Sequence, residues 1–151
     1  GGSKISNIRE LLQKEKCACI RCNEIKGGKV TATKMEKLTY PASKGEEVFF
    51  TMKTEAKICA ILRLRFSKKS VIKDASMIRE IHTYGQQVDF KNKEKEFVQH
   101  QGVGKKLIRE AEKETKKRGL DRIAVISGVG ARGYWKSLGY HVEKTYMVKN
   151  L

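Results

Sequence analysis

Residues 99–104 read Gln-His-Gln-Gly-Val-Gly and stand directly before an amphipathic helical pattern. Glycines at positions 102 and 104 leave the main chain without side chains, so its N–H groups can point toward a ligand without obstruction. The start of a helix adds partial positive charge, and the two features together suit a pyrophosphate group. The spacing is neither the dinucleotide fingerprint nor a P-loop, because no Gly-Lys-Ser/Thr follows. The stretch predicts an anion cradle, with a tight strand-to-helix turn as the structural alternative.

The chain alternates helix and strand after this stretch. Residues 102–118 carry one apolar stripe among charges, which predicts a helix that ends at Gly119. An apolar strand is predicted over 122–127, a short helix over 131–138 and a last strand over 140–148.

The chain before the cradle reads as consecutive strands. Strand patterns cover 29–40, 47–54, 57–66 and 76–84, with a turn over 41–45. The third pattern alternates, and its apolar face holds Ile58, Ala60, Leu62, Leu64 and Phe66, with Arg63 and Arg65 on the other face. Short turns between neighbouring strands favour an antiparallel meander. A short helix is predicted over 8–16, and a polar loop over 85–98.

The composition describes one basic domain. The chain has 151 residues, with 33 Lys and Arg against 17 Asp and Glu, for a net charge of +16. Such an excess attracts nucleic acid first and an anionic cofactor second, and a lysine-rich thermophilic proteome is the alternative explanation. No apolar run approaches the about 20 residues that span a bilayer, and no secretory signal is visible. We therefore expect a cytoplasmic protein without membrane contact.

Three of the four cysteines lie within six residues of sequence. Cys17, Cys19 and Cys22 form C-x-C-x-x-C, a spacing that lets thiolates converge on one tetrahedral metal ion. Cys59 points away from the apolar face of its strand. We therefore expect it to point toward the knuckle formed by Cys17, Cys19 and Cys22 and to supply a fourth thiolate. The prediction is structural zinc. An iron–sulfur cluster and free cysteines are the alternatives.

The order of elements around the cradle resembles the GNAT acetyltransferase fold, whose Gln/Arg-x-x-Gly-x-Gly/Ala loop holds the pyrophosphate of acetyl-CoA. The resemblance implies an α/β (α+β) fold with a mixed, mainly antiparallel sheet flanked by helices. Together with the cysteine spacing, we expect an N-terminal zinc-binding linker before this fold.

Several blocks are similar to the acetyltransferase half of the Elongator catalytic subunit, in the same order along the chain. These blocks are NIRELLQKEKCACIRCNEI, LRLRF, IREIHTYG, FVQHQGVGKKLIREAE, IAVISGVGARGYWKSLGY and YMVKNL. The resemblance implies a linker helix and cysteine knuckle over 1–28 and a GNAT domain over 29–151. The radical-SAM half of that family is missing, so we expect a piece of a longer protein.

The resemblance to the Elongator family also implies an activity. Members use S-adenosylmethionine, a [4Fe–4S] cluster and acetyl-CoA to build a carboxymethyl group on the wobble uridine (U34) of tRNA. This chain would bind acetyl-CoA, present its acetyl group and hydrolyse it when tRNA stimulates the reaction. The expected partners are tRNA, acetyl-CoA and the radical-SAM domain of the same protein, with a homodimer or accessory subunits as further candidates.

The same resemblance implies the residues that hold the cofactor. Backbone amides from Gln101 to Lys105 are expected to face the phosphates, and the splayed strand before Gly128 pairs with the pantetheine arm. The expected cofactor contacts are Gln99, Gln101, Gly102, Val103, Gly104, Lys105, Ile126, Ser127 and Tyr134.

Four residues are candidates for catalysis. Related GNAT enzymes usually carry Phe-Tyr where this chain has Tyr134-Trp135, and their tyrosine protonates the leaving thiolate. The indole of Trp135 is a poor acid, so Tyr134 or water supplies the proton, or both rings simply pack over the cofactor. Glu80 and His82 share one face of a strand, and either could activate water against the thioester. A structural glutamate and a hydrogen-bonded core histidine are the alternatives.

Two other functions remain open from the sequence alone. One is a protein-lysine acetyltransferase of the same fold, and the other is a catalytically inactive RNA-binding module. Labelled acetyl-CoA with tRNA or basic peptides separates the three.

Overall fold

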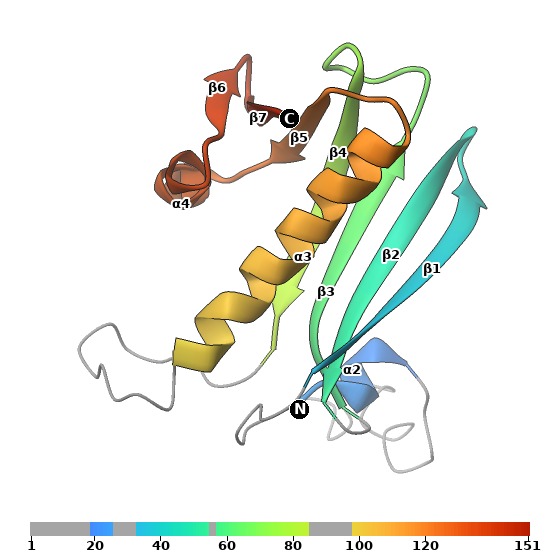
Figure 1. Cartoon of the computed structure of the whole chain (residues 1–151), viewed down its shortest axis with the longest axis vertical. Coiled ribbons are helices and arrows are strands. Elements are labelled where there is room, and N and C mark those ends of the chain that lie inside the picture. Colours follow the sequence, from blue (N-terminus) through green and yellow to red (C-terminus); the bar gives the residue numbers. More distant parts are fainter. Residues whose placement is uncertain (1–18, 26–32, 55–56, 85–97) are drawn as a thin grey trace, which may run out of the picture.

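The computed structural model describes residues 19–25, 33–54, 57–84 and 98–151, without the side chains of 98–101. The strands in these ranges form one sheet in the order β1-β2-β3-β4-β5-β7-β6 (Figure 1). In chain order the elements are α2 (Ile20–Asn23), β1 (Lys34–Ala42), β2 (Gly45–Thr54), β3 (Lys57–Phe66), β4 (Ala75–Thr83), α3 (Val98–Lys117), β5 (Arg122–Ile126), the 3-10 turn η2 (Val129–Ala131), α4 (Arg132–Ser137), β6 (His141–Glu143) and β7 (Tyr146–Asn150). No helix in the described ranges is long and apolar enough to cross a membrane.

Strands β1 to β4 form the predicted antiparallel meander. The first hairpin turns at Ser43 and Lys44, whose φ values of 40° and 60° match the left-handed residues of a tight two-residue turn. Gly45 follows because a Cβ there would lie 2.4 Å from the carbonyl oxygen of Phe66. The short turns keep the four strands adjacent, as the sequence pattern indicated.

The second half of the sheet begins with a parallel pair. Strand β5 pairs in parallel with β4, and β7 then pairs antiparallel with both β5 and β6. The predicted strand over 140–148 is therefore two strands, and the chain reverses at Lys144 with a φ of 56°. The predicted mixed, mainly antiparallel sheet flanked by helices is confirmed.

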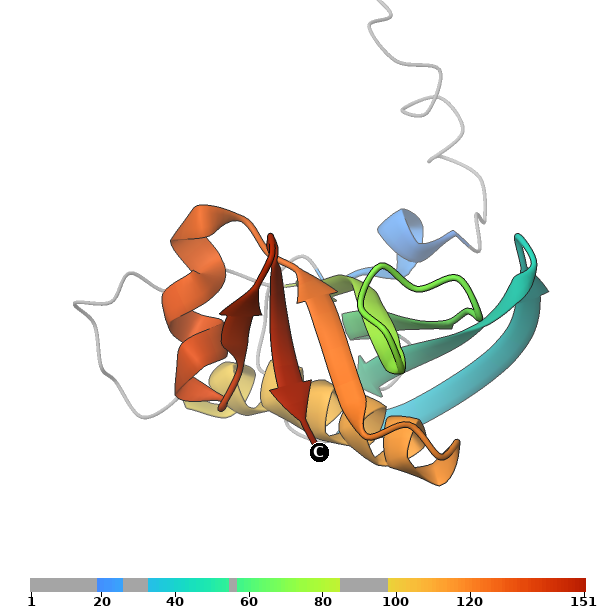
Figure 2. The same ribbon diagram turned by 90° about the horizontal axis from the view of Figure 1, so that it is seen from above.

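Helix α3 covers one face of the sheet (Figure 2). Its apolar stripe of Val103, Leu107, Ile108 and Ala111 is buried in the main core, as predicted. The helix begins at Val98, four residues before the predicted start at Gly102. Nothing from 98 to 101 breaks a helix, and a glycine inside one costs about 1 kcal/mol, so the two glycines do not stop it.

The opposite face of the sheet is covered differently. Helix α2 lies on this side, across the sheet from α3 (Figure 2). Its chain pairs with β3 through a bridge between Glu24 and Ile58. Ile72, from the β3–β4 connection, packs with Ala124 and Val148 in a second small core. Between these two covers, no other described helix lies on this face.

Candidate functional site

Strands β4 and β5 separate part of the way along. Their parallel pairing ends at Ile78 and Val125, although β4 continues to Thr83. The separation starts at a β-bulge, because Arg79 is an extra residue in the register between β3 and β4. A bulge bends its strand and increases the local twist. The bend at Arg79 therefore opens a gap between two central strands.

The β5 side of this gap is apolar and lacks a strand partner. Ile126 is 64% exposed and Val129 is 78% exposed. The main chain of Ile126 pairs with Tyr146 of β7 on one side and with no described strand on its β4 side. Ser127 follows, with its hydroxyl donating to the carbonyl oxygen of Gly128 at 3.0 Å. An unpaired strand edge beside apolar side chains can pair with an extended ligand.

Helix α3 begins next to the end of β4. The first four N–H groups of a helix have no partner within it. Because α3 starts at Val98, these donors lie in residues 98–101, slightly before the predicted stretch of Gln101 to Lys105. The side chains of Gln99 and Gln101 lie outside the described residues. A Cβ at Gly102 would meet nothing within 4 Å, so that surface of the first turns is open.

Gly104 marks a point where three elements meet. A Cβ there would lie 3.5 Å from Cγ2 of Thr83 and 3.9 Å from the hydroxyl of Tyr134. The end of β4, the second turn of α3 and helix α4 therefore converge around one glycine. Val103 faces the core, whereas Lys105 is exposed beside the cradle. No sequence pattern marked Thr83, because its position beside Gly104 depends on where the strand ends.

The two aromatic residues of α4 occupy different environments. Trp135 is buried, and its ring lies 5.0 Å from that of Tyr140, edge to face. Tyr134 is 42% exposed, and its ring lies 5.6 Å from that of Trp135. Trp135 therefore packs in the core of the protein, whereas Tyr134 remains accessible. Burial raises the pKa of Tyr134, so its phenol stays protonated at neutral pH and has a proton to donate.

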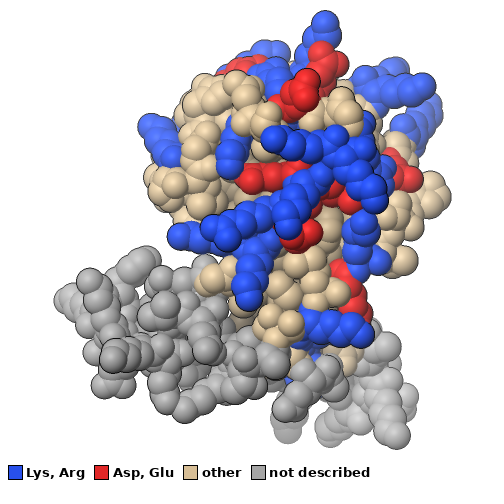
Figure 3. Space-filling view, viewed as in Figure 1, with Lys and Arg blue, Asp and Glu red and all other residues tan. Residues whose placement is uncertain are grey.

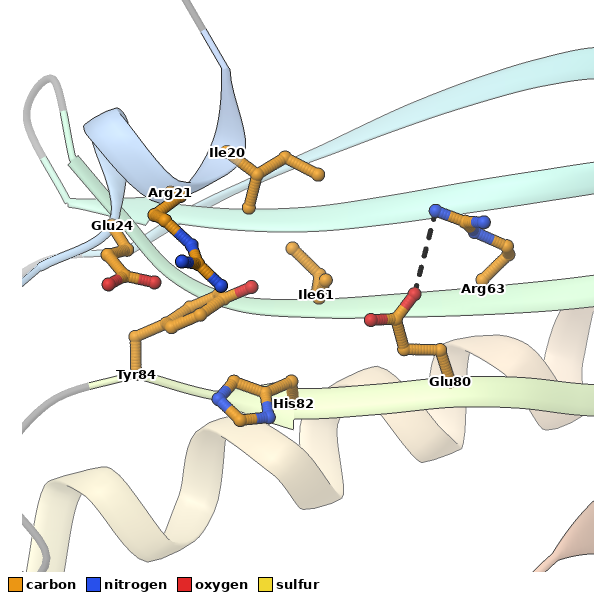
Figure 4. Close-up of a pocket in the computed structure, with 8 residues that line it drawn as sticks. All are labelled: Ile20, Arg21, Glu24, Ile61, Arg63, Glu80, His82 and Tyr84. Carbon is orange, nitrogen blue, oxygen red and sulfur yellow. Dashed lines mark ion pairs between the residues drawn. The ribbon is translucent and has the colours of Figure 1, made fainter. Parts of the chain in front are cut away.

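Glu80 and His82 line a pocket on the face of the sheet opposite α3 (Figure 4). The pocket measures about 540 Å³. Its lining residues are Ile20, Arg21, Glu24, Ile61, Arg63, Glu80, His82 and Tyr84. The shared face predicted for Glu80 and His82 is confirmed. Glu80 forms an ion pair with Arg63 at 3.5 Å, and the rings of His82 and Tyr84 lie 4.5 Å apart.

The candidate residues flank β4 from its two sides. Tyr134 and Gly104 lie on the α3 side, near Thr83, whereas Glu80 and His82 line the pocket on the other side. Side chains alternate along a strand, so neighbours His82 and Thr83 face opposite ways. A group lying in the gap between β4 and β5 can thus be approached by an acid from one face and a base from the other.

A buried carboxylate lies beside the bulge on the same face as the pocket. Glu47 is 3% exposed, and it accepts hydrogen bonds from Tyr40 and from Arg79, each at 2.9 Å. Arg65 and Arg63 lie 3.5 Å and 3.8 Å from its oxygens. Burial alone raises the pKa of Glu47, but these hydrogen bonds and positive charges outweigh it and lower the pKa overall. The sequence pattern showed the arginine face but not this carboxylate.

Among the described cysteines, Cys59 does not take the predicted orientation. Cys59 lies in the main core and its thiol donates to the carbonyl oxygen of Met52 at 3.2 Å. The predicted orientation toward the knuckle is wrong, because a bulge opposite Met52 and Lys53 turns Cys59 to the same side as Ala60. Cys17 lies outside the described residues. Among the residues described, no three His, Cys, Asp or Glu side chains could hold a metal ion.

Basic side chains gather on the surface around α3 (Figure 3). The exposed cations of this helix are Lys105, Lys106, Arg109, Lys113, Lys116 and Lys117. The acids of the helix bond to specific cations: Glu110 to Lys113, Glu112 to Lys149, and Glu114 to Lys37 and Arg118. The helix therefore presents more free positive than negative charge, although its sequence alternates in sign.

One family model matches most of the chain. The model described as "Acetyltransferase (GNAT) family" matches residues 31–140. That range includes the whole gap, the start of α3 and the aromatic pair.

Longer proteins contain a region of similar sequence. A tRNA uridine(34) acetyltransferase of Dehalococcoides mccartyi is 36% identical over 95% of this chain and 35% of its own length. Human Elongator complex protein 3 is 31% identical over 99% of this chain and 31% of its own length. The chain thus spans about a third of the curated relatives it matches.

A solved structure has the same arrangement. The archaeal Methanocaldococcus infernus Elp3 with an N-terminal deletion superposes with a TM-score of 0.74 and 30% identity. The match covers 95% of this chain and 37% of that one.

Proposed function

The chain belongs to the acetyltransferase (GNAT) family, an acyltransferase family, and from this we propose that it is the acetyl-CoA-binding acyl-donor domain of a tRNA uridine-modifying enzyme. The observation that carries the proposal is the gap between β4 and β5, which opens beside the start of α3. It offers an unpaired strand edge, exposed helix amides and a phenol within one site. We take tRNA as the nucleic-acid substrate because the similar protein of Dehalococcoides mccartyi is a tRNA uridine(34) acetyltransferase.

The residues of the gap fit acetyl-CoA. The open surface at Gly102 and the free amides of the first turn of α3 suit the pyrophosphate, with Lys105 adding charge beside it. The free edge of β5 at Ile126 and Ser127 suits the amide groups of the pantetheine arm. Gln99 and Gln101 remain predicted contacts, as does Val103 through its main chain. When bound, acetyl-CoA supplies an activated acetyl group as a thioester.

The chain's own groups can then direct hydrolysis. Glu80 or His82 takes a proton from a water molecule while the oxygen of that water forms a bond to the thioester carbonyl carbon. The carbon–sulfur bond breaks, and Tyr134 supplies the proton to the departing sulfur. Acetate and the thiol are the products. Trp135 holds the helix that carries Tyr134 against the core and takes no part in proton transfer.

The complete reaction needs a longer protein. By resemblance, we propose that tRNA binding stimulates the hydrolysis and that an attached radical-SAM domain uses S-adenosylmethionine and a [4Fe–4S] cluster to carboxymethylate U34. The predicted cytoplasmic location follows from that substrate. The positive surface of α3 and the arginines beside Glu47 support contact with tRNA.

A structural zinc ion remains a prediction that rests on the knuckle alone. The described residues do not fit a site with four cysteine thiolates, because Cys59 lies in the core. Cys17, Cys19 and Cys22 then need a fourth ligand from elsewhere, and no step of the reaction uses this ion.

One assay tests the proposed function against the alternatives. Labelled acetyl-CoA is incubated with the chain alone, with tRNA, and with a basic peptide. Acetate release that rises with tRNA supports the proposal. Transfer of label to peptide lysines would indicate a protein acetyltransferase, and no turnover in any mixture would indicate an RNA-binding module.

A further inference from the structure

The face of the sheet opposite α3 carries guanidinium groups where a covered face would carry apolar ones. Arg65 pairs across the strands with Glu47, and Arg63 pairs with Phe49. Arg79, the bulge residue of β4, reaches the same carboxylate. Three arginines therefore meet at one buried carboxylate, and the Arg65 side chain is the most buried of them, at 15% exposed. The side chains of Arg79 and Arg63 are 51% and 35% exposed.

One side of this cluster is a cationic hollow. A pocket of about 200 Å³ beside Arg79 is also lined by Arg65, Lys69 and Ile126, and none of its described lining residues is acidic. Arg65 is fixed there, because it donates to the carbonyl oxygens of Ala42 and Ser43 at 3.1 Å and 2.8 Å. Fixed guanidiniums are well suited to phosphate oxygens, because less side-chain freedom is lost on binding.

The other side of the cluster borders the pocket of about 540 Å³ that His82 and Tyr84 line. His82 and Tyr84 have tilted rings 4.5 Å apart, and they line one wall (Figure 4). Arg63 and Glu80 lie further along the same two strands and offer a donor and an acceptor. Nε of Arg63 is buried and makes no hydrogen bond within the described part of the chain.

The two hollows lie side by side along β3 and β4. Arg63 lines the aromatic pocket and Arg65 lines the cationic one. Two residues along a strand are about 7 Å apart. A base in the first hollow and a phosphate in the second can therefore belong to one nucleotide or to neighbours in one strand.

We propose that this face, between α2 and the β3–β4 connection, binds single-stranded RNA, with a base against His82 and Tyr84 and phosphates on Arg65, Lys69 and Arg79. The inference rests on RNA being the partner in the proposed function. A single strand fits because its bases are free to leave the stack and lie on aromatic rings. A protein partner fits less well, since stable protein interfaces have an apolar centre and this face has an ionic one.

The lysines of α3 are the competing surface. Helix α3 lies on the other side of the sheet (Figure 2), and its described residues offer separate ammonium groups without a ring pair. Such a surface adds attraction without fixing a strand. It therefore supplies a control of matched charge.

The test measures fluorescence anisotropy of a labelled oligouridylate with the full chain, against an RNA duplex of similar length. We expect the single strand to bind more tightly. Arg79→Gln should weaken its binding about tenfold and reduce the slope of log affinity against log salt by about 0.7, one phosphate contact. Tyr84→Leu should weaken binding about tenfold with an unchanged slope, because it removes stacking. Lys116→Gln, on α3, should change affinity less than twofold.

Acetyl-CoA titration of the same proteins separates this inference from the proposed function. Tyr84→Leu and Lys116→Gln should bind acetyl-CoA like the unaltered chain, because Tyr84 lines the pocket on the other face of the sheet and Lys116 lies in the last turn of α3. Tighter binding of the duplex, or equal losses from Arg79→Gln and Lys116→Gln, would overturn the inference and leave cofactor binding intact. Absent RNA binding by a chain that binds acetyl-CoA would overturn it too. Lost acetyl-CoA binding with intact RNA binding would instead contradict the proposed function.

Discussion

Arg79 of β4 donates a hydrogen bond to Glu47 of β2 at 2.9 Å, reaching across β3, which lies between the two strands. The contact depends on the bulge, because Arg79 is the residue that has no partner in the register with β3. The same bulge separates β4 from β5. One local irregularity therefore both opens the proposed cofactor gap and directs an arginine onto the face of the sheet opposite α3.

Replacing Glu47 by glutamine should destabilise the fold. The change removes the single buried charge that three arginines and Tyr40 share, and breaking such an ion pair costs about 3 kcal/mol when the partners remain partly solvated. Urea denaturation measures the loss. Glu36→Gln is the control, because Glu36 pairs with Lys53 on the surface, where solvent screens the pair, and the variant should lose much less stability. Equal losses from both variants would contradict the role of Glu47.

Acid should remove the same stabilisation. The pKa values of Glu47 and Glu114 are lowered in the folded chain, because hydrogen bonds and cations outweigh burial. A lowered folded pKa gives stability that is present above the unfolded pKa of about 4.3 and is lost as pH falls through the folded value. The urea midpoint should therefore fall steadily below about pH 5. In Glu47→Gln the decline should be shallower, and an identical decline would show that Glu47 does not titrate with folding.

Tyr134→Phe should impair turnover and spare binding. The variant keeps the aromatic ring and removes the hydroxyl group that we propose protonates the departing sulfur. A general acid contributes about 100-fold or more to the rate. The rate of acetate release should fall by about that factor, with the affinity for acetyl-CoA unchanged within about twofold. Tyr146→Phe, in β7, should behave like the unaltered chain. An unchanged rate in Tyr134→Phe would assign the proton to water.

Metal content should depend on the knuckle and not on Cys59. Elemental analysis of purified protein should find zinc in Cys59→Ala at the level of the unaltered chain. The Cys59 thiol lies in the core, where it donates a hydrogen bond to the carbonyl oxygen of Met52. Cys22→Ala should lose the metal. Loss of zinc in Cys59→Ala would restore the site with four thiolates, and iron in place of zinc would support the cluster alternative.

Residue patterns predicted the sheet well where strands are regular. The alternation over 57–66 correctly placed Leu62 and Leu64 on the core face and both arginines on the other. It failed at Cys59, because a bulge adds one residue and reverses the alternation locally. No residue type marks that bulge, and none marks the one at Arg79.

The start of α3 and the cluster around Glu47 show a different limit. Glycines at 102 and 104 suggested a loop, yet a helix begun at Val98 tolerates both. The contacts of Glu47 join four strands, so they depend on cross-strand register. By contrast, the motif placed Gly102 and Gly104 in the first turns of the helix, and the structure brings the Tyr134 hydroxyl close to Gly104.

The two glycines of α3 distinguish cofactor binding from stability. Alanine in place of either glycine should raise the free energy of unfolding by up to about 1 kcal/mol, because alanine favours a helix. Gly102→Ala should nevertheless weaken acetyl-CoA binding at least tenfold, since its methyl group enters the open surface over the first turns. Gly104→Ala should keep near-normal affinity, because its methyl group makes ordinary contacts with Thr83 and the related motif accepts alanine there. Equal affinities in both variants would move the phosphates away from Gly102.

Calorimetric titration of the folded chain with acetyl-CoA tests the central claim most directly. The account predicts saturable binding to one site, with a dissociation constant between about 1 µM and 1 mM, as is usual for an enzyme and its substrate. It also predicts competition by CoA, since the pyrophosphate and the pantetheine arm are common to both. A sample with intact secondary structure that shows no saturable heat at millimolar acetyl-CoA would contradict the account.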